Sequence, residues 1–149
     1  MKQGFTLIEM IIVIIIVGVL AAVGMIEYRK VVERSRGAEA RMVLGDIRKL
    51  AYEYYLENGT TAGITNAHVN IGGSAGQFPS PCRSTHYFQY AMTAPSSTSF
   101  ESHAWRCTAN GKSPQGLPSD STMCDSCRVL QLTSDFSTGT DTWTTWGVY

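Results

Sequence analysis

A single carboxylate stands in the apolar N-terminal segment of this 149-residue chain. Between Phe5 and Ile26, a stretch of 22 residues, Glu9 is the only ionisable side chain. A carboxylate in hydrocarbon costs about 2.5–3.5 kcal/mol, and such residues usually have a functional partner. No Lys, Arg or His lies between Phe5 and Tyr28 to provide one. Glu9 must therefore find a cation elsewhere or extend its carboxylate to water at the membrane interface.

A chain cut just before Phe5 would supply that cation. The new α-amino group would lie one helical turn from Glu9, about 6 Å along the helix axis. A neighbouring copy of the chain would offer the same amine, shifted by one turn. The sequence thus favours an ion pair between Phe5 and Glu9, and an interfacial Glu9 that reaches water is the alternative.

The cysteines are the second group of residues that could do chemistry. Outside a membrane we expect them to be oxidised, and four cysteines allow three connectivities. We expect Cys82–Cys107, which would tie a loop to a strand, together with Cys124–Cys127, which would close a local turn. In the alternative, Cys124 and Cys127 both pair back to Cys82 and Cys107. The Cys124-Asp125-Ser126-Cys127 spacing also suits zinc or redox chemistry, but no second such pair accompanies it.

The other polar side chains form no catalytic motif. His68, His86 and His103 are scattered, and neither a G-x-S-x-G sequence nor a metal-binding helix motif occurs. We therefore expect a protein that is not an enzyme and has no cofactor. The segment 135–141 has the look of a calcium loop through Asp135 and Asp141, but it lacks the closing Glu of an EF-hand. Those two residues are weak calcium candidates, and otherwise we expect no metal.

The first element that positions these residues is a helix long enough to cross a membrane. As a helix, residues 5–26 would be about 33 Å long, close to the hydrocarbon thickness of a bilayer. This apolar run is longer than the core of a secretory signal, about 7–15 residues. We expect an uncleaved anchor, and Lys2 predicts that the short N-terminal side stays in the cytoplasm.

Residues 27–58 continue the helix with an amphipathic pattern, and Asn58-Gly59 is a typical helix end. Apolar positions at three- and four-residue spacing are expected to pack on a globular head: Ala40, Val43, Ile47, Leu50 and Tyr54. A basic cluster precedes them, consisting of Arg29, Lys30, Arg34 and Arg36. Because acidic residues are mixed with it, we interpret the cluster as a solvated or subunit-facing surface rather than a nucleic-acid or lipid patch.

The remaining chain, 59–149, has the composition of a β-rich head. Residues 59–85 are rich in Gly, Ser, Thr and Ala and predict a long loop. Four short runs with strand composition follow: 86–92, 100–107, 127–133 and 142–148. The predicted fold class is α+β, with a long N-terminal helix over about 5–58 packed on an antiparallel sheet of about four strands. The formal net charge is zero, so the composition gives no reason to expect nucleic acid as a partner.

The N-terminus carries a family resemblance. Met1-Lys2-Gln3-Gly4, followed by Phe5-Thr6-Leu7-Ile8-Glu9 and a long aliphatic run, resembles the class III leader and N-terminus of type IV pilins and pseudopilins. The resemblance implies that a prepilin peptidase cuts between Gly4 and Phe5 and that the new Phe5 amine is methylated. It also implies that Glu9 pairs with a Phe5 amine during assembly. The order of helix, loop and sheet is similar to the pilin fold as well.

One position departs from the family. Type IV pilins commonly have a proline near the end of the apolar stretch, where this sequence has Ile26. The helix is therefore not forced to break there, which favours a pseudopilin or a minor pilin.

The resemblance implies a structural subunit of a type IV pilus-like extracellular filament that serves adhesion, motility or surface attachment. The expected parts are a leader (1–4), a membrane and filament-core helix (5–26), an amphipathic helix (27–58) and a head (59–149). Expected partners are other copies of the chain, the prepilin peptidase, the inner-membrane assembly machinery and the membrane. The precursor would lie in the inner membrane before export. The alternatives are a pseudopilin in the periplasmic pseudopilus of a type II secretion system and a membrane-anchored binding domain that does not polymerise.

Overall fold

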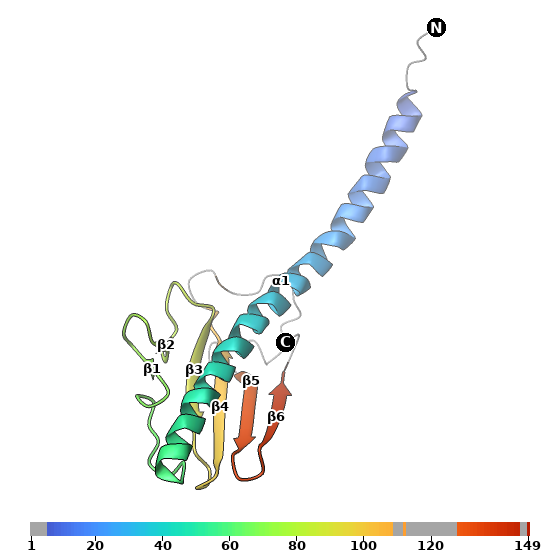
Figure 1. Ribbon diagram of the computed structural model, residues 1–149. Coiled ribbons are helices and arrows are strands. Elements are labelled where there is room, and N and C mark those ends of the chain that lie inside the picture. The colour runs from blue at the N-terminus through green and yellow to red at the C-terminus, as the bar shows by residue number, and fades with distance from the viewer. Residues whose placement is uncertain (1–5, 109–111, 113–127, 147–148) are drawn as a thin grey trace.

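The computed structural model describes residues 6–108, 112, 128–146 and 149 (Figure 1). One helix, α1 (Leu7–Asn58), runs for 52 residues. Its C-terminal half lies across a four-stranded sheet, and its N-terminal half projects away from the head (Figure 1). The predicted α+β class and the packing of a long helix on the sheet are confirmed.

Both ends of α1 are capped. Thr6 is the N-cap residue, with its side chain accepting a hydrogen bond from the Glu9 backbone N–H. At the other end Gly59 adopts φ 71°, and its N–H donates to the Tyr55 carbonyl at 2.8 Å. Glycine reaches this left-handed conformation without a steric penalty, which is why the helix ends at the predicted Asn58-Gly59 pair.

The sheet is a simple antiparallel meander in the order β3-β4-β5-β6. Its strands are β3 (Phe88–Thr93), β4 (Ser99–Arg106), β5 (Arg128–Asp135) and β6 (Thr140–Thr145). Each lies within a few residues of a run that the sequence predicted. A register shift at Ala104 and Trp105 interrupts the pairing of β4 with β5.

The core fills the space between α1 and the sheet. The buried face of the helix consists of Ala40, Leu44, Ile47 and Ala51, whereas the predicted Val43, Leu50 and Tyr54 pack at its margin. Opposite them lie buried side chains of three strands: Phe88, Tyr90, Phe100, Ala104, Leu130 and Leu132. The predicted stripe is therefore rotated slightly, because Leu44 and Ala51 take the buried positions and Val43, Leu50 and Tyr54 lie beside them.

The predicted loop contains a structure that the sequence did not indicate. Two short segments, β1 (Ile71–Gly72) and β2 (Phe78–Pro79), form a parallel pair. The Arg83 guanidinium donates to the carbonyl of Gly72 at 3.2 Å and to that of Ser74 at 3.0 Å. A pairing of two residues on each side has no detectable sequence period, so the loop composition concealed it.

Candidate functional site

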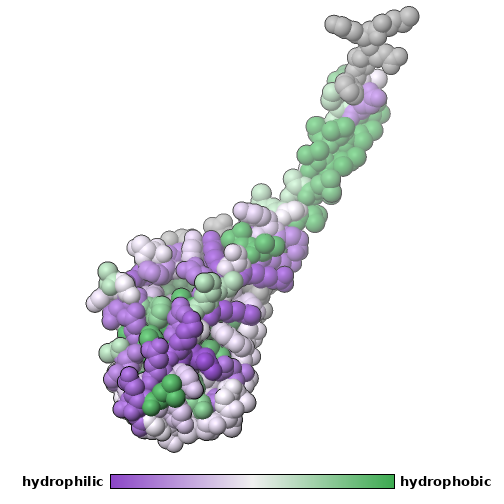
Figure 2. All heavy atoms as spheres, viewed as in Figure 1, coloured by the Kyte–Doolittle hydropathy of each residue, from purple (hydrophilic) through white to green (hydrophobic). Residues whose placement is uncertain are grey.

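The candidate site is the N-terminal half of α1, which projects away from the described residues of the head (Figure 1). Over this part of the helix every side chain from Thr6 to Tyr28 is exposed. Figure 2 shows it as a hydrophobic band between the polar head and the N-terminal tip. By length and composition, α1 is able to cross a membrane. An apolar surface of this size is not stable in water, so it must be covered by lipid or by other helices.

At the tip of this segment Glu9 is held by Thr6. The Oε2 atom of Glu9 accepts hydrogen bonds from the Thr6 backbone N–H and from Thr6 Oγ1, both at 2.8 Å. The Thr6 hydroxyl in turn accepts from the Glu9 N–H at 3.4 Å. This reciprocal arrangement is a capping box, and it points the carboxylate toward the N-terminal end of the helix. Gly4 and Phe5 lie outside the described residues.

The helix continues without a break through the position where a proline would stand in the resembling family. Gly18, Gly24 and Ile26 all lie within the continuous α1. The two glycines each weaken a helix by about 1 kcal/mol relative to Ala, which is too little to interrupt one of this length. The span and the head are thus joined by one uninterrupted element.

The head is bound to α1 through hydrogen bonds to a buried carboxylate that the sequence did not indicate. Glu33 is 2% exposed and Arg106, at the end of β4, is fully buried. Arg106 Nη2 donates to Glu33 Oε1 at 2.8 Å, and Arg106 Nε donates to Oε2 at 3.1 Å. Arg36 Nη1 donates to Oε1 at 2.5 Å, and the Tyr149 hydroxyl donates to Oε2 at 3.0 Å. We call these four residues the Glu33 cluster.

Burial alone would raise the pKa of Glu33, but hydrogen bonds from Arg106, Arg36 and the Tyr149 hydroxyl, together with the charge of Arg106, lower it below its usual range. Burial and the nearby Glu33 carboxylate raise the pKa of Tyr149. The ring of Tyr149 rests on Gly37, where an added Cβ would lie 2.7 Å from its Cδ1 atom. The cluster therefore fixes the point at which α1 leaves the head.

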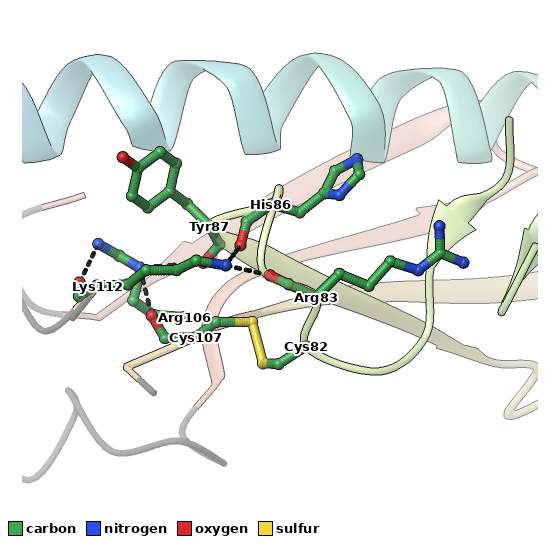
Figure 3. The surroundings of a disulfide bond; sticks show 7 residues. All are labelled: Cys82, Arg83, His86, Tyr87, Arg106, Cys107 and Lys112. Atoms are coloured by element: carbon green, nitrogen blue, oxygen red, sulfur yellow. Dashed lines mark hydrogen bonds between the residues drawn. A yellow bond between two sulfur atoms is a disulfide. The ribbon is translucent and has the colours of Figure 1, made fainter. Parts of the chain in front are cut away.

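A disulfide joins Cys82 to Cys107, the residue that follows Arg106 of this cluster (Figure 3). This is the first of the two pairings that the sequence favoured, and it ties the loop before β3 to the end of β4. Lys112 Nζ donates to the carbonyls of Arg83 and His86, and its own carbonyl accepts from Arg106 Nη2 at 2.8 Å. Cys124 and Cys127 lie outside the described residues.

The two calcium candidates lie on the β5–β6 hairpin and are engaged within the protein. Asp135 Oδ1 accepts from the Ser137 N–H and hydroxyl at 2.9 and 2.7 Å, and these bonds lower the pKa of Asp135. Asp141 Oδ1 accepts from Arg48 Nε at 2.7 Å. Within the part of the chain that the structure describes, no group of three or more His, Cys, Asp or Glu side chains is placed to hold a metal.

Sequence reasoning found Glu9 but missed the Glu33 cluster. Glu33 and Arg106 are separated by 73 residues, so no local spacing connects them. Glu33 also stands among basic residues on the helix and had the appearance of an ordinary surface charge. The only available signal was its position on the same helical face as the buried Ala40 and Ile47.

Comparison with known proteins finds sequence similarity to pilins and fimbrial proteins. Residues 1–25 match a family model described as the prokaryotic N-terminal methylation motif. The chain is 39% identical over 79 residues to a type IV major pilin protein, PilE1, of Neisseria gonorrhoeae, covering 49% of this chain and 48% of that protein. It is 47% identical over 59 residues to a probable minor fimbrial protein of Dichelobacter nodosus, covering 40% and 36%.

A third relative, a fimbrial protein of Neisseria meningitidis, is 38% identical over 73 residues, covering 45% of this chain and 43% of that protein. The chain thus matches less than half the length of each of these relatives. No solved structure is significantly similar to it. The predicted resemblance to the type IV pilin family is confirmed.

Proposed function

We propose that this chain belongs to the type IV pilin family, and that it is a structural subunit of an extracellular filament and not an enzyme. The observation that carries the proposal is the fully exposed apolar half of α1, which projects from the head as a single rod (Figures 1 and 2). A bilayer covers this surface in the precursor, and the same surface is covered by like helices in a filament. Polymerisation is then the transfer of an apolar helix from lipid to a bundle of helices.

Processing and assembly are proposed to use the N-terminal residues that the sequence indicated. A peptidase cuts between Gly4 and Phe5, and the released Phe5 amine is methylated. The amine of one subunit then pairs with Glu9 of another and neutralises the carboxylate. The capping box supports this role, because it holds the Glu9 carboxylate at the end of the helix where such an amine would arrive.

The test is filament formation by two variants in the native strain. Glu9→Val removes the carboxylate and Gly4→Ala blocks cleavage, and we expect either change to abolish sheared surface filaments. Glu27→Gln is the matched control, because it removes an exposed carboxylate whose hydrogen bond to Lys30 is local. N-terminal sequencing of the wild-type protein should start at a methylated Phe5. Filaments of normal length from either variant would refute the assembly model, and a retained leader would indicate an anchored domain that does not polymerise.

The second candidate is a pseudopilin of a type II secretion system. The unbroken helix through Ile26 favours it, because the proline that commonly marks type IV pilins is missing. The two candidates differ in abundance and phenotype. A pilus subunit would dominate sheared surface filaments, whereas loss of a pseudopilin would block protein secretion without loss of surface filaments.

A further inference from the structure

Four basic side chains follow directly after the apolar span, and the structure divides them into two kinds. Lys30 Nζ pairs with Glu27 at 2.7 Å, and Arg36 belongs to the Glu33 cluster. Arg29 and Arg34 have no carboxylate within 4.0 Å among the described residues. We call residues 27–34 the neck. Because Glu33 faces inward to Arg106, it does not neutralise the outer surface of the neck. Two arginine charges therefore remain available to an external partner.

The available cations lean toward the apolar segment. Arg29 Nη2 lies 3.8 Å from Met25 Sδ, one turn back along the helix. Arg34, two turns beyond Glu27, is exposed. Long side chains on a helix point toward its N-terminus, which here is the direction of the membrane. Next to them Tyr28 is 69% exposed, and tyrosine is enriched at the level of lipid headgroups.

Axial position places both arginines within reach of the headgroup layer. Along the helix Arg29 lies about 4.5 Å beyond Ile26 and Arg34 about 12 Å beyond it. The polar layer on each side of a bilayer is about 5–7 Å thick, so Arg29 lies within it and the long side chain of Arg34 reaches back to it. A membrane boundary at Ile26–Tyr28 thus puts both guanidinium groups among phosphates.

Their directions around the helix favour lipid over a second protein. At 100° per residue, Arg29 and Arg34 point about 140° apart. A single flat protein surface cannot cover both, whereas headgroups surround a membrane helix on all sides. Arginine also binds phosphate oxygens through two parallel N–H groups.

We propose that Arg29 and Arg34 bind the phosphate groups of anionic phospholipids while the chain is in the bilayer. This rests on the membrane-anchored stage of the proposed function. The bound lipids hold the neck at the membrane surface and so set the height of the head above it. The site is released when the helix leaves the lipid.

The experiment uses the full chain, first floated with phosphatidylglycerol–phosphatidylcholine vesicles and then extracted in mild detergent. Native mass spectrometry measures the ratio of retained phosphatidylglycerol to retained phosphatidylcholine of the same acyl chains. In the Arg29→Gln, Arg34→Gln variant we expect this ratio to fall roughly 30-fold, about fivefold for each charge removed. Arg29→Lys with Arg34→Lys should keep most of the preference. Arg41→Gln with Lys49→Gln removes the same number of charges farther along the helix and should leave the ratio unchanged.

Several results would overturn the proposal. An unchanged lipid ratio in the double Gln variant would show that the arginines do not bind headgroups. Displacement of phosphatidylglycerol by millimolar inorganic phosphate would indicate a simple anion site. Unchanged lipid binding with reduced self-association would assign the arginines to contacts between copies. A chain that fails to float with vesicles would refute the membrane-anchored stage itself, whereas a floating chain without lipid preference refutes only this proposal.

Discussion

Loss of the Glu33 side chain should destabilise the head strongly. Its carboxylate is buried and accepts hydrogen bonds from Arg106, Arg36 and Tyr149. Removing one partner of a buried ion pair leaves the other charge uncompensated, which typically costs about 3–5 kcal/mol. We expect Glu33→Ala to lower the free energy of unfolding of the head by an amount in this range. Denaturant unfolding of the detergent-solubilised chain, followed by head tryptophan fluorescence, measures it.

Glu27→Ala is the control for this experiment. Its partner Lys30 is also on the surface, and exposed pairs contribute about 0–1 kcal/mol. Equal losses in the two variants would contradict a special role for the Glu33 cluster.

The same residue predicts a pH dependence. The pKa of Glu33 in the folded protein is lower than that of an unfolded glutamate, about 4.3. A lowered carboxylate pKa stabilises the fold above the unfolded pKa, and the stabilisation is lost as the pH falls through the folded value. We expect the melting temperature of the wild type to fall more steeply below about pH 4 than that of Glu33→Gln. Parallel melting curves between pH 3 and pH 7 would show that Glu33 does not contribute this dependence.

Among single residues, the sequence predicted conspicuous side chains better than it predicted contacts between residues far apart in the chain. Glu9 is conspicuous because every residue around it is apolar. Cys82 and Cys107 were favoured because their bond ties a loop to a strand. Arg106 had no such signal, because a buried guanidinium is explained only by its partner, and that partner comes from a distant part of the chain.

Among the elements, α1 allows the clearest prediction, because the helix passes through Ile26 without a break. Proline at this position would remove a backbone donor and clash with the preceding turn, at a cost of about 3 kcal/mol. We expect Ile26→Pro to accelerate amide hydrogen exchange over residues 22–30 in detergent micelles. Ile26→Ala should leave exchange unchanged. Equal protection in the Pro variant and the wild type would show that this stretch is already open.

The elements were largely predictable and their packing was not. Composition and turn residues gave the strands β3 to β6 to within a few residues, and Asn58-Gly59 gave the end of α1. The β1–β2 pair was missed because two residues on each side are too few to show a sequence period, and its backbone hydrogen bonds lie within a loop of ordinary composition. The buried face of α1 was slightly misplaced, because Leu44 and Ala51, rather than Val43 and Leu50, meet the sheet.

At the scale of the whole molecule, the zero net charge is an average over two parts with different surfaces, one apolar and one mostly polar. The projecting part of α1 is exposed and apolar, while the head has its own core and a mostly polar surface (Figure 2). Among the described residues the helix itself connects them, and the Glu33 cluster lies where that helix enters the head. The order of these parts followed from the sequence, but the place of the junction required the structure.

The unbroken helix also fixes the rotation of the head about the helix axis. Each residue added between Ile26 and Glu33 would turn the head by about 100° around the rod and move it about 1.5 Å away from the span. Seven added residues would restore its original facing to within about 20° while lifting it by about 10 Å. The number of residues between Ile26 and Glu33 therefore sets the direction in which the head faces around the helix axis, independently of any contact that the head makes.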